Sequence, residues 1–214
     1  MYFCRYSSSI QKLFVYLHAE LRANNVLKHQ NMEKNRLEAF SDGVLAIIIT
    51  IMVLELSQPA GDGFKDLLAL WPTLMAYGIS FLFVAIYWVN HHLIFLKAER
   101  INVKILWCNI AWLFVMSLIP FATAWVGAYP TSWVPLSVYF ADMALAAITF
   151  HWMYYLIAVE RGEKATFRLS VRNYVSLATY ILAAAFGGFC PVAAFIIVAA
   201  VTCWWIVPEK KKEN

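Results

Sequence analysis

The side chains of this chain that could do chemistry are a few ionisable and amide groups inside long apolar stretches. They are Asp42, Asn90, His91, His92, Asp142 and His151. If those stretches cross a membrane, each such side chain is costly to place there and is a candidate functional residue. Groups of this kind can attract a cation, relay a proton or, as a facing pair of imidazoles, ligate haem iron.

Haem ligation and enzyme catalysis fit these residues poorly. A bis-histidine site needs two imidazoles at matching depth, and His151 lies about 15 Å from its predicted inner boundary, several Å deeper than His92. We find no plausible pair of nucleophile and base. The cysteines show no metal-ligand spacing and are interpreted as small core residues; they are Cys4, Cys108, Cys190 and Cys203. The sequence therefore predicts no enzyme, no metal and no cofactor.

The elements that carry these residues are predicted to be membrane-spanning helices. Of the 214 residues, 62% are hydrophobic and 14% are charged, whereas a soluble domain is about half apolar and about one quarter charged. This composition excludes a disordered chain, a disulfide scaffold and a water-soluble enzyme domain. The apolar runs are continuous rather than alternating, as in helices. They cover residues 37–56, 67–96, 105–126, 132–159, 169–186 and 189–207, which predicts an all-α protein with six spans.

Proline and glycine positions agree with these helices. Pro72 and Pro191 fall in predicted first turns, where a missing N–H costs nothing. Pro120 lies inside the third stretch and is expected to kink it. Gly187 and Gly188 predict a tight turn between the last two spans.

Basic residues predict the orientation. Of the 17 lysines and arginines, all except Lys65 fall in the N-terminal tail, in the C-terminal tail, or in the two loops at residues 97–104 and 161–172. The positive-inside rule then puts both termini in the cytoplasm. This asymmetry explains the net charge of +4 without a nucleic-acid partner.

The chain divides into three predicted parts. Residues 1–34 form a cytoplasmic extension, 35–208 the membrane domain, and 209–214 a basic cytoplasmic tail. The extension is either dispensable, with an alternative start at Met32, or an amphipathic helix on the inner leaflet.

A polar cluster is predicted near the cytoplasmic ends of the first two spans. Asp42 lies about 9 Å and His92 about 8 Å from that boundary. We expect a hydrogen-bonded network of Arg36, Ser41, Asp42 and one neighbouring histidine. It either forms a scaffold or gate at the cytoplasmic mouth or only fixes helix register. For Asp142 and His151 a proton relay is one interpretation, but we expect each to be satisfied by a neighbouring hydroxyl or amide.

The first span carries a stripe at helical spacing. It consists of Gly43, Ile47, Thr50 and Leu54, with Ile51 on its flank. Such a stripe is common in ordinary helix packing. In a symmetric oligomer it would line an axis, where rings of Ile and Leu form a dry constriction and a ring of Thr50 hydroxyls offers oxygens to an ion.

Two motifs resemble a known family. Residues 36–42 read R-x-x-x-F-S-D, with Arg36, Phe40, Ser41 and Asp42 at the fixed positions, and residues 88–92 read W-V-N-H-H. They resemble the transmembrane protein 175 family of endolysosomal potassium channels in its six-span bacterial form, over residues 35–207. The resemblance implies a homotetramer in which each chain gives its first span to a central pore. It also implies preference for potassium over sodium without a Gly-rich carbonyl filter.

The resemblance also assigns residue roles. Bulky aliphatic residues of the first span lie at the narrowest points of the pore, which maps to Ile47 and Leu54 with Thr50 between them. The motif residues, with Asn90, His91 and His92, then brace the pore helix rather than coordinate ions.

We therefore predict a potassium-selective leak-type channel of a bacterial plasma membrane. Its partners are potassium ions, lipid and other copies of itself. The alternative is a proton-coupled transporter that uses Asp42, Asp142 and His151. Neither a pseudo-repeat nor paired broken helices, the usual features of transporters, is present in the sequence.

Overall fold

A computed structural model describes residues 3–162 and 170–207, and these residues contain helices and no strand. The predicted basic tail at 209–214 lies outside them. The helices are α1 (Phe3–Leu54), α2 (Phe64–Ala69), α3 (Trp71–Lys97), α4 (Val103–Met116), α5 (Ile119–Ala128), α6 (Trp133–Glu160), α7 (Val171–Phe186), the short 3₁₀ helix η1 (Gly187–Phe189) and α8 (Pro191–Trp204).

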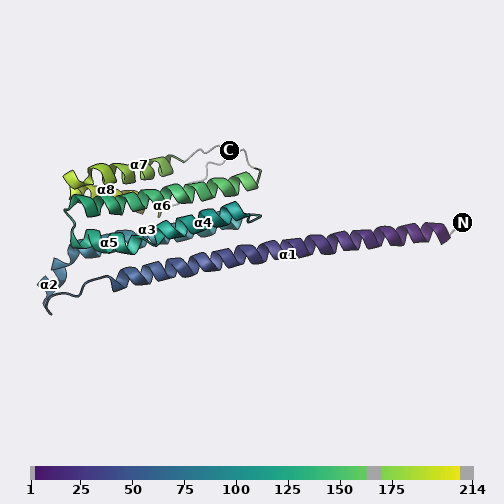
Figure 1. Ribbon diagram of the computed structural model, residues 1–214, viewed down its shortest axis with the longest axis horizontal. Helices are drawn as coiled ribbons and strands as arrows, with labels where there is room; N and C mark the ends of the chain where they lie inside the picture. The colour runs from purple at the N-terminus through teal and green to yellow at the C-terminus, as the bar shows by residue number, and fades with distance from the viewer. Residues whose placement is uncertain (1–2, 163–169, 208–214) are drawn as a thin grey trace.

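The helices form a bundle with α1 along one edge (Figure 1). Helices α3 to α8 lie side by side, and α1 packs against α3, α4 and α5. Helix α1 is 52 residues long and continues well past the end of the bundle toward the N-terminus. It has no break near residue 35, where the sequence predicted the membrane domain to begin.

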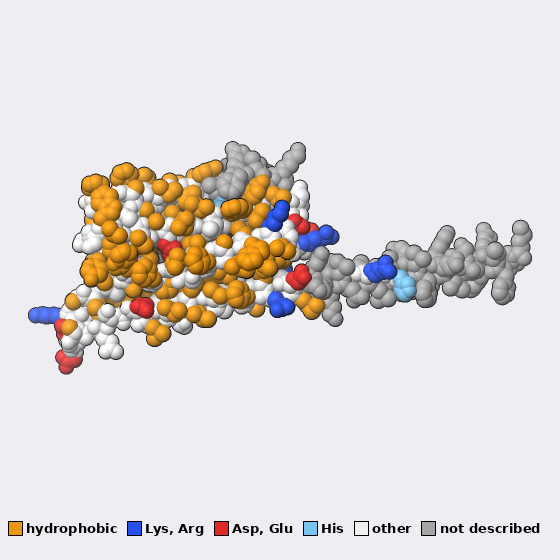
Figure 2. Space-filling view, in the orientation of Figure 1, with side chains coloured by type: hydrophobic (Ala, Val, Ile, Leu, Met, Phe, Trp, Pro, Cys, Tyr) orange, Lys and Arg blue, Asp and Glu red, His pale blue; other side chains and the backbone are white. Residues whose placement is uncertain are grey.

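Four segments are long and apolar enough to cross a membrane. They are Met32–Leu54, Trp71–Lys97, Val103–Ala128 and Trp133–Glu160. Helix α8 is apolar but shorter, and α7 has 16 residues. Figure 2 shows Lys and Arg at the two ends of the bundle, with a wide apolar band between them. The all-helical, multi-pass membrane fold predicted from the sequence is confirmed.

The predicted helix starts and turns agree with the structure. Pro72 and Pro191 lie in the first turns of α3 and α8. At Pro120 the third stretch does more than kink: α4 ends at Met116 and α5 begins at Ile119. Gly187 and Gly188 begin η1, where an added Cβ on Gly188 would lie 2.7 Å from the Trp133 ring.

An aromatic core joins α3, α4 and α6. The ring of Tyr87 lies 4.7 Å from Phe83 and 5.0 Å from Phe150, and Phe150 lies 5.5 Å from Trp112. Trp112 is fully buried and stacks on His91. This packing sets the position of the α3 histidine discussed below.

Candidate ion path and its support

Helix α1 has one face buried against its own bundle. The buried residues recur every three or four positions, the repeat of one side of an α-helix; they are Leu37, Ser41, Leu45, Ile48 and Met52. This face packs on α3, α4 and α5. Val44 and Ile49 beside this face are partly buried, and the opposite side of α1 is left uncovered by the chain.

The stripe predicted from the sequence lies on the uncovered face. Ile47 is 58% exposed and Leu54 is 80% exposed, and Gly43, Thr50 and Ile51 are exposed with them. The Thr50 hydroxyl donates to the Ile47 carbonyl at 2.8 Å. Its proton is therefore used within the helix, and the oxygen lone pairs remain available to a cation.

A buried chain of hydrogen bonds ties α1 to α3 and α4. His91 Nε2 lies 2.9 Å from Asn109 Oδ1, Asn109 Nδ2 donates to Ser41 Oγ at 2.9 Å, and Ser41 Oγ donates to the Leu37 carbonyl at 2.9 Å. His91, Asn109 and Ser41 are all buried. We call His91, Asn109 and Ser41 the bracing triad.

The triad determines which nitrogen of His91 carries a proton. Because the Asn109 amide nitrogen donates to Ser41, its oxygen faces His91 and accepts, so His91 Nε2 is protonated. The imidazole stacks on Trp112 with centroids 5.1 Å apart and planes 14° apart, and Phe95 lies 4.5 Å away on centroids. The ring is thereby fixed both by packing and by a directional bond.

The network predicted for Arg36, Ser41, Asp42 and one histidine is present only in part: Ser41 is joined to His91 through Asn109, whereas Asp42 lies outside this chain of hydrogen bonds. Asp42 accepts a hydrogen bond from Trp88 Nε1 at 2.9 Å, on the exposed side of α1 and α3. Among the described residues, Arg36 takes part in neither the chain nor this contact and is exposed, as are Phe40 and His92. Asn90 donates to the Ile86 carbonyl of its own helix at 2.8 Å.

Sequence reasoning missed Asn109, the centre of the triad. It lies in the middle of α4, within an apolar stretch that was interpreted as a plain span. The available signal was a lone amide in a membrane helix, a residue that usually forms a hydrogen bond across helices.

The two deep ionisable residues of α6 behave differently. His151 Nε2 lies 3.0 Å from the Asn173 amide nitrogen of α7, so the expectation of an amide partner is confirmed there. For Asp142 the same expectation is wrong. Neither carboxyl oxygen has a hydrogen-bond partner among the described residues, although both are buried.

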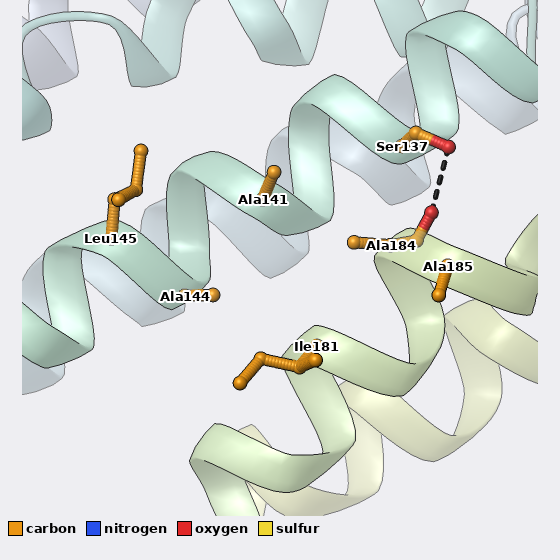
Figure 3. Close-up of a pocket in the computed structure, with 7 residues that line it drawn as sticks. All are labelled: Ser137, Ala141, Ala144, Leu145, Ile181, Ala184 and Ala185. Carbon is orange, nitrogen blue, oxygen red and sulfur yellow. Dashed lines mark hydrogen bonds between the residues drawn. The ribbon is translucent and has the colours of Figure 1, made fainter.

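An apolar groove separates α6 from α7. Alanines line most of it, with Ser137, Leu145 and Ile181, and the Ser137 hydroxyl donates to the Ala184 carbonyl at 2.7 Å (Figure 3). Small side chains allow membrane helices to approach closely. The groove carries no charged side chain, and α1 does not line it.

Comparisons with known proteins decide the family. A model of the family described as endosomal/lysosomal potassium channel TMEM175 matches residues 36–120. A protein named as a potassium channel from Chryseobacterium sp. (strain P1-3) is 39% identical over 187 residues, covering 86% of this chain and 97% of that protein. The chain belongs to the TMEM175 family. The resemblance of the R-x-x-x-F-S-D motif is thereby confirmed.

Further members of the TMEM175 family match over different shares of the chain. The crystal structure of a lysosomal potassium-selective channel TMEM175 homologue from Chamaesiphon minutus has 29% sequence identity and a TM-score of 0.70, covering 82% of this chain and 97% of that one. The human protein named as an endosomal/lysosomal proton channel is 34% identical over 84 residues, only 17% of its length. These TMEM175 relatives are ion channels, so the prediction that the chain is not an enzyme is confirmed.

Proposed function

We propose that this chain is a potassium-selective, leak-type cation channel of the plasma membrane. It acts as a homotetramer of six-span subunits with both termini in the cytoplasm, and transport is passive. The bacterial relatives named as potassium channels support this proposal. The observation that carries it for this chain is the uncovered stripe on α1.

The chemistry of the uncovered face favours an ion path over contact with lipid. Thr50 of the stripe is exposed, and Asp42 of α1 and His92 of α3 are exposed elsewhere on these two helices. Hydrocarbon does not solvate such groups, so polar residues in membrane spans face other helices or water. A fourfold assembly around the stripe meets this requirement, because it removes the face from lipid.

In that assembly the stripe would form stacked rings. Ile47 and Leu54 would supply aliphatic constrictions, and the Thr50 oxygens would lie between them. A narrow apolar ring requires an ion to shed part of its hydration shell. Potassium is larger and less strongly hydrated than sodium, so the ring penalises sodium more. Selectivity then comes from dehydration rather than from a carbonyl filter.

The bracing triad gives the stripe its fixed orientation. Its hydrogen bonds lie on the buried face of α1, opposite the stripe. Rotation of α1 about its axis would break the Asn109–Ser41 bond and expose a buried donor. The triad therefore positions pore residues without contacting the ion, a role that fits side chains held by both packing and hydrogen bonds.

Ion flux from proteoliposomes tests this function. Vesicles loaded with potassium or sodium at matched gradients should release potassium rapidly and sodium slowly, at a rate that a pH gradient does not change. Absence of flux for both ions from folded, oligomeric protein would refute the channel.

A proton-coupled transporter is the second candidate, favoured by one observation. Asp142 is buried without a partner among the described residues, as expected for a group that exchanges protons during transport. A transporter would accumulate potassium against its gradient when a pH gradient is imposed. A channel would only equilibrate it, so the same vesicles distinguish the two functions.

A further inference from the structure

Like the Trp112 indole nitrogen, and unlike most buried polar groups of the described bundle, Asp142 has no hydrogen-bond partner. It is 5% exposed, and neither Oδ1 nor Oδ2 has a hydrogen-bond partner among the described residues. Ser80, by contrast, lies 2.7 Å from Thr123 Oγ1 and 2.9 Å from the Tyr139 hydroxyl. A buried polar group without a partner is rare enough to require an explanation.

The position of Asp142 in the bundle follows from one contact between α4 and α6. Cys108 Sγ lies 3.7 Å from the Thr149 carbonyl, and the two helices run in opposite directions. Seven residues from this contact, toward the C-terminus of α4 and toward the N-terminus of α6, Val115 and Asp142 lie at the same level. Val115 is one residue before the end of α4, next to the break between α4 and α5. At that break Pro120 has no N–H, so the Met116 carbonyl lacks its usual helical donor. A carboxylic acid can donate to a carbonyl of this kind, whereas a carboxylate cannot.

Few of the titratable side chains on α6 and on the elements that contact it are basic. Helix α5 and η1 carry no titratable side chain. The others carry Lys104 and Cys108 (α4), Arg172, Tyr174 and Tyr180 (α7), Tyr77, Tyr87, His91, His92 and Lys97 (α3), Cys203 (α8), and Tyr139, His151, Tyr154, Tyr155 and Glu160 on α6 itself.

The two lysines and the arginine among these side chains lie far from Asp142. Lys104 and Arg172 lie in the first turns of α4 and α7 and Lys97 is the last residue of α3, all distant along the helices from the middle of α6. Arg172 lies over the ring of Trp204 at 5.2 Å and donates to the Val207 carbonyl. An ionised carboxylate at position 142 would therefore be buried without a counter-charge, which is strongly unfavourable.

We propose that Asp142 is a proton-binding site that couples the packing of α6 against α4 and α5 to pH. With the proton bound, the carboxylic acid is neutral and the helices close around it. When the acid gives its proton to water, the carboxylate that remains must draw in water or a cation, and the helices separate. Helix α5 also packs on α1, so the change reaches the proposed pore helix. This site goes beyond the proposed channel function and does not require it.

Thermal unfolding as a function of pH tests the site. Asp142→Asn keeps the shape of the neutral acid and cannot ionise. The difference in melting temperature between wild type and Asp142→Asn should be smallest at about pH 4 or below, where the aspartate of the unfolded chain is also largely protonated, and wild type should melt lower by at least about 3 °C at about pH 9. Asp62→Asn, a change of an exposed carboxylate in the outer loop, should follow the wild-type profile. Parallel profiles for wild type and Asp142→Asn over the whole range would overturn the proposal.

Infrared spectroscopy keeps the proposal testable if Asp142→Asn fails to fold. Wild type in lipid should show the C=O stretch of a protonated carboxylic acid, and this band should disappear as pH rises. Asp142→Glu should shift the band. A wild-type spectrum without it at acidic and neutral pH would overturn the proposal. Potassium flux of the same preparation at one fixed pH reports the channel function separately.

Discussion

Replacing Asn109 with alanine should destabilise the bundle strongly, because Asn109 holds both ends of the bracing triad. The change removes the bonds to His91 and Ser41, each worth about 1 kcal/mol, or about 0.6 kcal/mol by membrane-protein measurements. It also leaves the buried His91 Nε2–H without its acceptor, which costs about 1–3 kcal/mol. Ser41 keeps its hydrogen bond to the Leu37 carbonyl, so the Ser41 hydroxyl adds little further penalty. The total loss is about 2–5 kcal/mol.

Asn90→Ala is the matched control for this prediction. Asn90 is likewise an asparagine inside a helix of the bundle, α3, but among the described residues its side chain bonds only to the Ile86 carbonyl of its own helix. Thermal unfolding in detergent should show Asn109→Ala melting about 5–12 °C below wild type, with Asn90→Ala shifted much less. If the two variants lost equal stability, the triad would not be what holds α1 to α3 and α4.

Two further substitutions test the packing of η1 and of α3 against α6. Gly188→Ala should destabilise the protein by about 1–3 kcal/mol, because the new Cβ would lie 2.7 Å from the Trp133 ring. Ser80→Ala should cost about 1–3 kcal/mol, because the fully buried Tyr139 hydroxyl loses its partner at 2.9 Å. Thermal unfolding measures both.

Each of these substitutions has a control elsewhere in the chain. An added Cβ on Gly78 meets nothing within 4 Å, so Gly78→Ala should leave the melting temperature near wild type or raise it. Ser117→Ala removes an exposed bond to the Phe114 carbonyl of its own helix and should change stability little. Destabilisation by a control as large as that of its partner would contradict the packing described here.

The sequence predicted the helices well because their signals are local. Continuous apolar runs and first-turn prolines depend only on neighbours in the chain, and Pro72 and Pro191 lie where such prolines are expected. The length of α1 was not predicted, since residues before Met32 lack a continuous apolar run. Polar sequence and helical structure are compatible, and composition alone does not mark where a helix begins.

The sequence predicted how far along the helices the polar side chains lie, but not which hydrogen-bond partners they have. His91 and His92 differ by one residue and therefore by about 100° around α3; His91 is buried and His92 is exposed. Depth placed Asp42 level with this pair, yet its partner is Trp88, one turn earlier. Rotation of each helix about its axis comes from long-range packing, which a single sequence does not specify.

The central claim is that the uncovered face of α1 lines the ion path, and a matched pair of isoleucines tests it most directly. Ile47 is 58% exposed on α1, and Ile196 is 62% exposed on α8, so the two differ chiefly in which helix presents them. The ratio of potassium to sodium flux should be measured in proteoliposomes for wild type, Ile47→Ser and Ile196→Ser. We expect Ile47→Ser to lower the ratio several-fold and Ile196→Ser to leave it at the wild-type value. An unchanged ratio in Ile47→Ser, or an equal change in both variants, would contradict the assignment of the pore to this face.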